Sequence, residues 1–370
     1  MVTTTQLNGT PRPGIRLSYP SIDDCLGPAG QRFFGSGYRR VGYTMRGGVL
    51  RSTSSGVRLT ATAHVGHPRD WSVKGGGRPQ RPHLTTLDAI VLATRAGELC
   101  AARAHGLDRA QRNRTRLRRI DVKAAPAPVE AGLEDVAVDI RLLASAPPVS
   151  GRPEPGAAVP AGTLLSTVDG RVAGMRVRIV LEHDAGDLPG THRAGWLPMP
   201  DGVPAHRRPG AFGRGYAGGW QSIRHVILDL ADASARAQVC LGTGAAPPAP
   251  PASAGRSASS RPPSAIDSFV VALQLGQALL YEIDEIPRAE SDTLWMRHTT
   301  IIDEVAAATA SPAAPGEPVV ATARLCDPVL VTSRDATWRT ATIDADLAGI
   351  RTRCAVAHRL PAHRAGIGAR

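Results

Sequence analysis

Two carboxylates stand at matching places ahead of apolar runs, and both are candidates for acid–base chemistry. Thr85-Thr86-Leu87-Asp88 and Ser264-Ala265-Ile266-Asp267 each place a hydroxyl residue three positions before an acid. This spacing predicts a capping box at a helix start, where an acid also complements the helix dipole. The alternative is that Asp88 or Asp267 is a general base for a hydroxyl acceptor, while free N–H groups of the helix polarise a carbonyl. Both interpretations stay open, because the acid of one copy could cap its helix while the acid of the other copy acts as the general base.

Other candidates flank these runs. His83 precedes the first run, whereas Arg261 lies at about the matching place before the second. One active site in a duplicated scaffold would produce this asymmetry, although a loop histidine is often a plain surface residue. Arg297 and His298, matched by Arg118 in the first copy, are expected on the strand after each helix. They are candidate substrate-binding residues, or else they occupy an ordinary edge strand.

The remaining reactive residues form no recognisable centre. The five cysteines are widely spaced and none forms a C-x-x-C pair, so neither a disulfide framework nor a zinc site is predicted. We expect no metal and no cofactor. No G-x-S-x-G sequence occurs, and Cys100 inside the first apolar run is expected in the core. Direct transfer between bound reactants, without a covalent enzyme intermediate, is the mechanism these observations favour.

The elements that position these residues occur twice. Leu87-Asp88-Ala89-Ile90-Val91-Leu92-Ala93 returns in the second half of the chain as Ile266-Asp267-Ser268-Phe269-Val270-Val271-Ala272. Upstream, Phe34-Gly35-Ser36-Gly37-Tyr38 returns as Phe212-Gly213-Arg214-Gly215-Tyr216, and the two offsets in numbering differ by only one position. Two motifs in one order at nearly one offset indicate an internal duplication. The glycines of the second motif are expected to form turns with positive φ.

Each copy predicts one helix within a sheet. Ala89–Ala93 and Phe269–Leu273 are apolar on every side, and a helix of this kind must be surrounded. Strand-like alternation precedes and follows each helix. The sequence therefore predicts an α+β fold, a tandem or double hotdog in which each antiparallel sheet wraps around one buried helix. Gly97 and Gly276, in the middle of the helices, suggest close packing of another backbone.

The predicted domain boundaries follow from the repeat and from Pro- and Gly-rich connectors. Residues 1–20 are expected to be a flexible N-terminus and residues 21–190 lobe 1. Residues 191–208 are expected to be a linker, residues 209–361 lobe 2 and residues 362–370 a flexible C-terminus.

Composition limits the partners. The formal charge is +12, but lysine occurs only at Lys74 and Lys123, so all the other basic residues are scattered arginines. Without interleaved aromatics or a recognised spacing, no nucleic-acid binding is expected. No apolar stretch approaches the length of a membrane span and no signal peptide is visible, so we expect no membrane association and a cytoplasmic location.

Several of these motifs resemble one known family. Ser21-Ile22-Asp23-Asp24-Cys25-Leu26-Gly27-Pro28, Arg32–Arg40, Ala272–Gln277 and Arg288–Arg297 are similar to motifs of the AvrD family. The resemblance spans roughly Ser21 to Pro361, and the insertion Ala245–Pro263 departs from it. AvrD-type proteins are associated with making syringolides, which join a β-ketoacyl chain to a pentulose. Their logic is similar to that of AfsA-type γ-butyrolactone synthases.

The resemblance implies transfer of an acyl group from a β-ketoacyl thioester to a hydroxyl of a polyol acceptor, with an acyl carrier protein as a candidate donor partner. Asp88 or Asp267 would be the base, aided by His83, and Arg297, His298 and Arg118 would hold a carrier phosphate or the β-keto oxygen. Two alternatives stay open: a hotdog dehydratase or thioesterase acting on acyl thioesters, and a non-catalytic protein that binds an acyl ligand.

Overall fold

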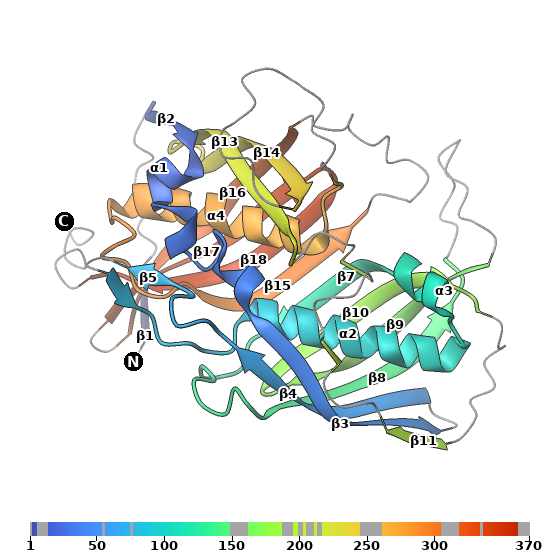
Figure 1. Cartoon of the computed structure of the whole chain (residues 1–370). Coiled ribbons are helices and arrows are strands. Elements are labelled where there is room, and N and C mark those ends of the chain that lie inside the picture. The colour runs from blue at the N-terminus through green and yellow to red at the C-terminus, as the bar shows by residue number, and fades with distance from the viewer. Residues whose placement is uncertain are drawn as a thin grey trace.

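The chain folds as two hotdog lobes that share one continuous antiparallel sheet (Figure 1). The computed structural model describes residues 2–5, 14–53, 56–74, 77–148, 162–186, 195–198, 203–204, 211–212, 217–244, 261–304, 318–333 and 336–361. The predicted flexible C-terminus, residues 362–370, lies outside the described residues. The predicted α+β double hotdog is confirmed by the arrangement of the two lobes.

Lobe 1 wraps its strands around helix α2 (Thr86–His105). The strands lie in the spatial order β3 (Gly42–Thr53), β4 (Gly56–Gly66), β8 (Val136–Ala146), β9 (Thr163–Val172), β10 (Met175–Asp184) and β7 (Arg116–Lys123). The short helix α3 (Arg109–Arg114) follows α2, and a small hairpin, β5 (Val73–Lys74) with β6 (Arg78–Pro79), precedes it.

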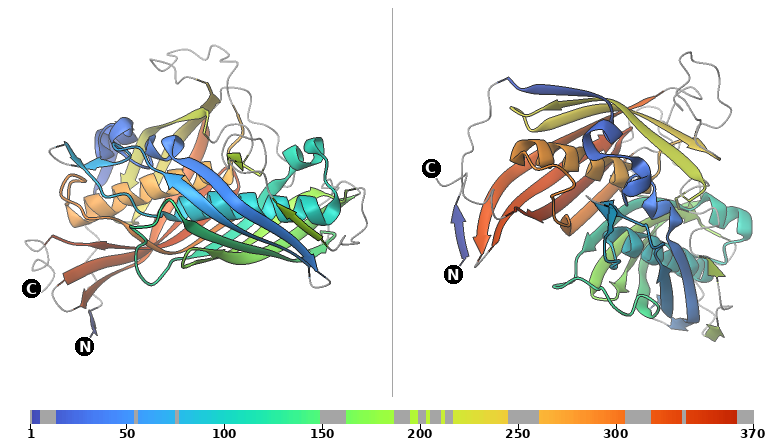
Figure 2. Two further views of the ribbon diagram at one scale, coloured as in Figure 1. Left: turned by 60° about the horizontal axis from the view of Figure 1, so that its bottom comes forward. Right: turned by 60° about the vertical axis from the view of Figure 1, so that its left-hand side comes forward.

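Lobe 2 repeats this plan around helix α4 (Ala265–Asp284). Its strands lie in the order β15 (Trp295–Asp303), β18 (Ile350–Arg359), β17 (Ala336–Leu347), β16 (Val319–Ser333), β14 (Ser234–Thr243), β13 (Gly219–Asp229) and β2 (Arg16–Ser21). The lobes join where β15 pairs with β7, for instance Ile301 with Ile120. The views in Figure 2 show α4 between the β15–β18 side of the sheet and strands β13, β14 and β2.

The two central helices are equivalent and enclosed, as the repeat predicts. They have the same length, and the offset between their first residues equals the offset between their last. The apolar side chains of α2 and α4 form one core with the inward-facing strand residues. By length and composition α4 could cross a membrane, but 83% of its most apolar window is buried inside the fold. It is the core helix of lobe 2.

The N-terminal boundary of lobe 1 needs correction. Residues 16–20 were expected in a flexible terminus, but they belong to β2, which pairs with β13 of lobe 2. Helix α1 (Ile22–Leu26) follows and buries Ile22 and Leu26 against lobe 2. Strand β1 (Val2–Thr5) also pairs with β16. Strands β1 and β2, at the start of the chain, thus belong to the lobe 2 part of the sheet.

The predicted linker also contributes strands. Within residues 191–208, β11 (Gly195–Pro198) and β12 (Val203–Pro204) both pair with β3 and extend the edge of lobe 1. The chain also turns within the alternating segment Arg171–Glu182. Ala173 adopts a φ of 48° and turns the chain, so β9 and β10 form a hairpin.

The paired glycines have a different role from the one expected. A Cβ at Gly276 would lie 2.3 Å from Cδ1 of Ile343, and one at Gly97 would lie 3.3 Å from Cδ1 of Leu181. Side chains of the sheet, rather than another backbone, therefore approach the helices here.

Gly35 and Gly37 do not have positive φ. They are needed because a Cβ would lie 2.3 Å and 2.1 Å from carbonyl oxygens of Ala29 and Trp71.

Candidate active site between the lobes

A pocket of about 80 Å³ lies where the N-terminus of α2 meets the C-terminal half of α4. Lobe 1 contributes the β5–β6 hairpin and the segment that enters α2, and lobe 2 contributes α4 and the loop after it. The pocket is lined by Arg32, Phe33, Phe34, Trp71, Ser72, Lys74, Gln80, His83, Thr85, Gln277, Tyr281, Arg288, Asp292, Thr293, Leu294 and Met296. Charged, aromatic and hydroxyl side chains thus converge at one helix N-terminus.

The start of α2 borders this pocket through Thr85. Thr85 is the N-cap: its Oγ1 accepts from the Asp88 N–H at 3.1 Å, and its own N–H donates to Asp88 Oδ2 at 2.7 Å. The predicted capping box is confirmed. The next N–H groups, those of Thr86 and Leu87, have no partner within the described chain. Helix N-termini with free N–H groups and a favourable dipole stabilise negative charge.

Asp88 lies behind this turn and does not line the pocket. Its side chain is fully buried, and its Oδ1 accepts a hydrogen bond of 2.6 Å from the hydroxyl of Tyr43. Nε2 of the buried His67 lies 3.5 Å from Oδ2. Asp88 therefore holds the first turn of α2 in place, and the structure gives it no direct route to a ligand in the pocket.

His83 does line the pocket, directly before the helix start. Its ring contacts Trp71 edge-on at 5.3 Å between centroids and lies 6.1 Å from the ring of Trp295. Nδ1 lies 3.4 Å from the carbonyl oxygen of Arg81, which leaves Nε2 for a ligand. Burial lowers the pKa of His83 below its usual value. An imidazole that is neutral at neutral pH has a free lone pair and can accept a proton.

The equivalent place in lobe 2 is closed by an ion pair. Arg261 donates to both carboxylate oxygens of Asp267, at 2.6 and 2.7 Å, and Ser264 completes the predicted capping box. Burial opposes ionisation of Asp267, but the hydrogen bonds and charge of Arg261 and the bonds from Ser264 outweigh it and lower the pKa. Asp267 is nearly inaccessible, at 1% exposed, so it has no access to a substrate.

The three predicted substrate-binding residues lie elsewhere. Arg297 is exposed at a β-bulge of β15, between Met296 and His298. His298 faces the opposite side of the sheet, in a wide, mostly basic hollow of about 1090 Å³. Arg118 is committed to ion pairs with Glu182 at 2.9 Å and Asp303 at 3.7 Å. The structure brings none of them to His83.

Sequence reasoning missed most of the pocket wall. Besides His83, the ionisable side chains of this wall are those of Lys74, Arg288, Arg32, Tyr281 and Asp292, and none of these five is among the site residues predicted from the sequence. Two signals were present: Lys74 is one of only two lysines, and Arg288 matches Arg109 at the offset of the repeat. Neither signal shows that a hairpin of lobe 1 lies against the loop after α4, which requires the three-dimensional arrangement.

Comparisons with known proteins identify the family. Solved structures similar to this chain include the tesB protein of Mycobacterium avium subs paratuberculosis, with 9% identity, a TM-score of 0.34 and coverage of 84% of this chain and 96% of that chain. The putative thioesterase of Novosphingobium aromaticivorans has 10% identity, a TM-score of 0.31 and coverage of 84% and 98%. GphF dehydratase 1 has 16% identity, a TM-score of 0.29 and coverage of 85% and 97%. The comparison with curated proteins found no match. The model of the Pseudomonas avirulence D protein family matches residues 17–361, and the chain therefore belongs to the AvrD family.

Proposed function

We propose that this protein transfers the acyl group of a β-ketoacyl thioester to a hydroxyl of a small polyol in the pocket between its lobes. One observation carries the proposal: His83, which burial keeps neutral, lines the same pocket as Thr85, the N-cap of α2, and the N–H groups of the next two residues have no partner among the described residues. A base and an oxyanion-stabilising element within one pocket are what acyl transfer requires. Membership of the AvrD family supports the choice of a β-ketoacyl donor.

In this mechanism the thioester carbonyl oxygen lies near the N–H groups of Thr86 and Leu87. Nε2 of His83 takes the proton of the acceptor hydroxyl as its oxygen attacks the carbonyl carbon. The negative charge on the carbonyl oxygen is stabilised by the N–H groups and the dipole of α2. The C–S bond then breaks, and the thiolate takes the proton from the imidazolium, which leaves an ester, a free thiol and the neutral histidine.

Direct transfer agrees with the state of the cysteines. Cys100 and Cys354 are fully buried, and burial raises the pKa of each thiol to about 12. Cys25 lies near Glu282, and burial together with that carboxylate raises the pKa of its thiol to about 12 as well. Because the thiolate is the nucleophile, such groups are inert at neutral pH. We therefore assign no acyl-enzyme intermediate to these cysteines.

The proposal places one working site in the chain, at α2. In lobe 2, Arg261 forms an ion pair with Asp267 at the start of α4. Arg261 also stands at about the position that matches His83, so lobe 2 has no histidine there. The sequence-based hypothesis gave the role of base to Asp88 or Asp267. The proposal gives it to His83 instead and leaves Asp88 to position the first turn of α2.

Incubation of the full chain with an acetoacetyl thioester and a panel of triose and pentulose acceptors tests this function by mass spectrometry. We choose a short acyl group because the pocket is small, with a volume of about 80 Å³, roughly that of three water molecules. An ester of acceptor and acyl group supports the proposal. Free acetoacetate formed equally with and without acceptor favours a thioesterase, and thioester binding without turnover favours a binding protein. A dehydratase is recognised by an enoyl product from a β-hydroxyacyl thioester.

A further inference from the structure

Among the described residues, two cations at the pocket have no carboxylate partner. The Nζ atom of Lys74 donates to the carbonyl oxygen of Ser291 at 2.6 Å, and its only other hydrogen bond in the described chain is to the hydroxyl of that residue. Arg288 donates to the carbonyl oxygens of Val73 at 2.9 Å and Gln31 at 3.2 Å. Both side chains are half-buried. In the described part of the chain, neither forms an ion pair with an acid.

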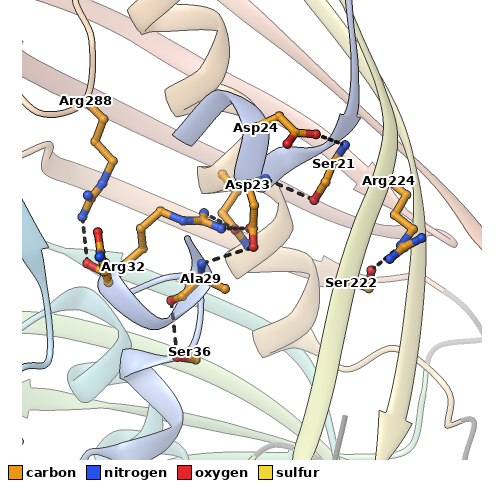
Figure 3. Close-up of polar contacts among 11 residues, drawn as sticks. Ser21, Asp23, Asp24, Ala29, Arg32, Ser36, Ser222, Arg224 and Arg288 are labelled. Atoms are coloured by element: carbon orange, nitrogen blue, oxygen red, sulfur yellow. Dashed lines mark hydrogen bonds and ion pairs between the residues drawn. The ribbon is translucent and has the colours of Figure 1, made fainter. Parts of the chain in front are cut away.

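A third cation adds an unsatisfied donor. Arg32 is only 3% exposed and lines the same pocket, and its guanidinium donates to Asp23 and Gln274. Its Nε nevertheless has no hydrogen-bond partner among the described residues. Figure 3 shows Arg288 descending from the segment after α4 to the loop that carries Arg32. A buried N–H without a partner is rare in native structures, and an acceptor atom of a bound ligand or an ordered water would satisfy it.

The charges at this corner of the pocket oppose one another. Burial and then the neighbouring Arg288 lower the pKa of Lys74 to about 8; Arg78 acts in the same direction, and Asp292 opposes them. Burial also lowers the pKa of Arg32 and of Arg288. Asp292 is exposed and forms no ion pair with Lys74. Neutral hydrogen-bond donors would be enough to hold the β5–β6 hairpin against lobe 2. The contacts of the hairpin therefore do not explain why charged side chains occupy these positions.

We propose that Lys74, Arg288 and Arg32 form a subsite for an oxyanion group of the ligand, either a phosphate monoester or a carboxylate. The arginines offer planar N–H donors and the lysine a compact positive charge, which is the combination that binds phosphate and carboxylate oxygens. The assignment of that group to the hydroxyl acceptor rests on the function proposed above. It would place the anion at the hairpin corner and the reacting hydroxyl toward His83. Binding of the anion itself does not depend on acyl transfer.

Calorimetric titration of the full chain with sulfate tests the subsite, because sulfate carries no titratable proton near pH 8. Sulfate should bind with uptake of about half a proton per ion at pH 8, since Lys74, with a pKa of about 8, is half neutral there and becomes charged in the complex. Lys74→Met should weaken binding about tenfold or more, and Arg288→Met similarly. Lys123→Met, on the opposite face of the sheet, should bind as the wild type does.

Lys74→Arg separates charge from proton linkage: it should keep sulfate binding but lose most of the proton uptake. Parallel titrations with inorganic phosphate and with acetate distinguish a phosphate-type subsite from a carboxylate subsite. Unchanged affinity in both Lys74→Met and Arg288→Met, or loss of affinity in Lys123→Met instead, overturns the proposal. If sulfate binds as predicted while no acceptor is acylated, the subsite stands and only the proposed transfer fails.

Discussion

Replacing Asp267 by Asn removes one charge from the buried ion pair that closes the lobe 2 site. Arg261 and Asp267 are 8% and 2% exposed at their side chains, and the guanidinium donates to both carboxylate oxygens. The amide of Asn offers one acceptor where the carboxylate offers two, and it leaves the guanidinium charge without a counter-ion. Breaking a buried pair in this way costs about 3–5 kcal/mol of unfolding free energy.

Asp88→Asn is the matched control, because Asp88 holds the same capping position in lobe 1. Its partners are the Tyr43 hydroxyl, the Thr85 N–H and the ring of His67, with no arginine. The amide leaves at most one of these contacts unsatisfied, which costs about 1–3 kcal/mol. The losses of unfolding free energy should therefore differ by about 2 kcal/mol, although both substitutions replace a carboxylate by an amide at equivalent positions.

Urea denaturation of both variants at neutral pH measures this difference. A double variant, Arg261→Gln with Asp267→Asn, should recover most of the loss, because it removes both charges. The pKa of Asp267 is lowered in the fold, so its contribution is complete above its unfolded value of about 3.9 and is lost as the pH falls through the folded value. The gap between wild type and Asp267→Asn should therefore narrow in acid. Equal losses for Asp88→Asn and Asp267→Asn would refute the difference drawn between the lobes.

The remaining predictions concern the enclosed helices. Gly276→Ala should destabilise by about 1–3 kcal/mol, because its methyl group would meet Ile343 at 2.3 Å. Gly97→Ala meets Leu181 at 3.3 Å and should be neutral or stabilising by up to about 1 kcal/mol through helix propensity; thermal unfolding distinguishes the pair, and equal effects would contradict the packing. Phe269→Ala should cost about 3–5 kcal/mol in a denaturant titration, since the ring is fully buried, and a loss below about 1 kcal/mol would show that α4 is not enclosed.

The fold could be predicted from the sequence because the internal repeat and the two buried helices are recognisable from the spacing and hydrophobicity of neighbouring residues. A helix that is apolar on every side must be buried by other elements. The constant offset of the repeat also places the two helices at equivalent residues. The pairing of β2 with β13 was not accessible. It joins the start of the chain to a strand of the second half, and nothing in the composition of Arg16–Ser21 specifies lobe 2 as its partner.

The candidate site was only partly accessible for a related reason. The sequence placed His83 and Asp88 at one helix start and noted that Arg261 breaks the symmetry. Which of these residues lines a pocket depends on how the fold buries each side chain. His83 lines the pocket, whereas the carboxylate of Asp88 is fully buried. Arg297 and His298 stay predictions for substrate binding, and the structure places Arg297 at the bulge in β15 and His298 in the hollow on the opposite face of the sheet from His83.

Initial rates of acetoacetyl transfer by wild type, His83→Gln and His298→Gln, measured between about pH 5 and about pH 8, test the assignment of the active site to the start of α2. In the proposed mechanism the base form of His83 is the active form, and burial lowers its pKa, so the wild-type rate should stay level through neutral pH and fall only below about pH 6.5. His83→Gln should lose about 10²- to 10⁴-fold in rate together with this acid limb, whereas His298→Gln should behave as the wild type. Full activity in His83→Gln, with the acid limb retained, would contradict the assignment.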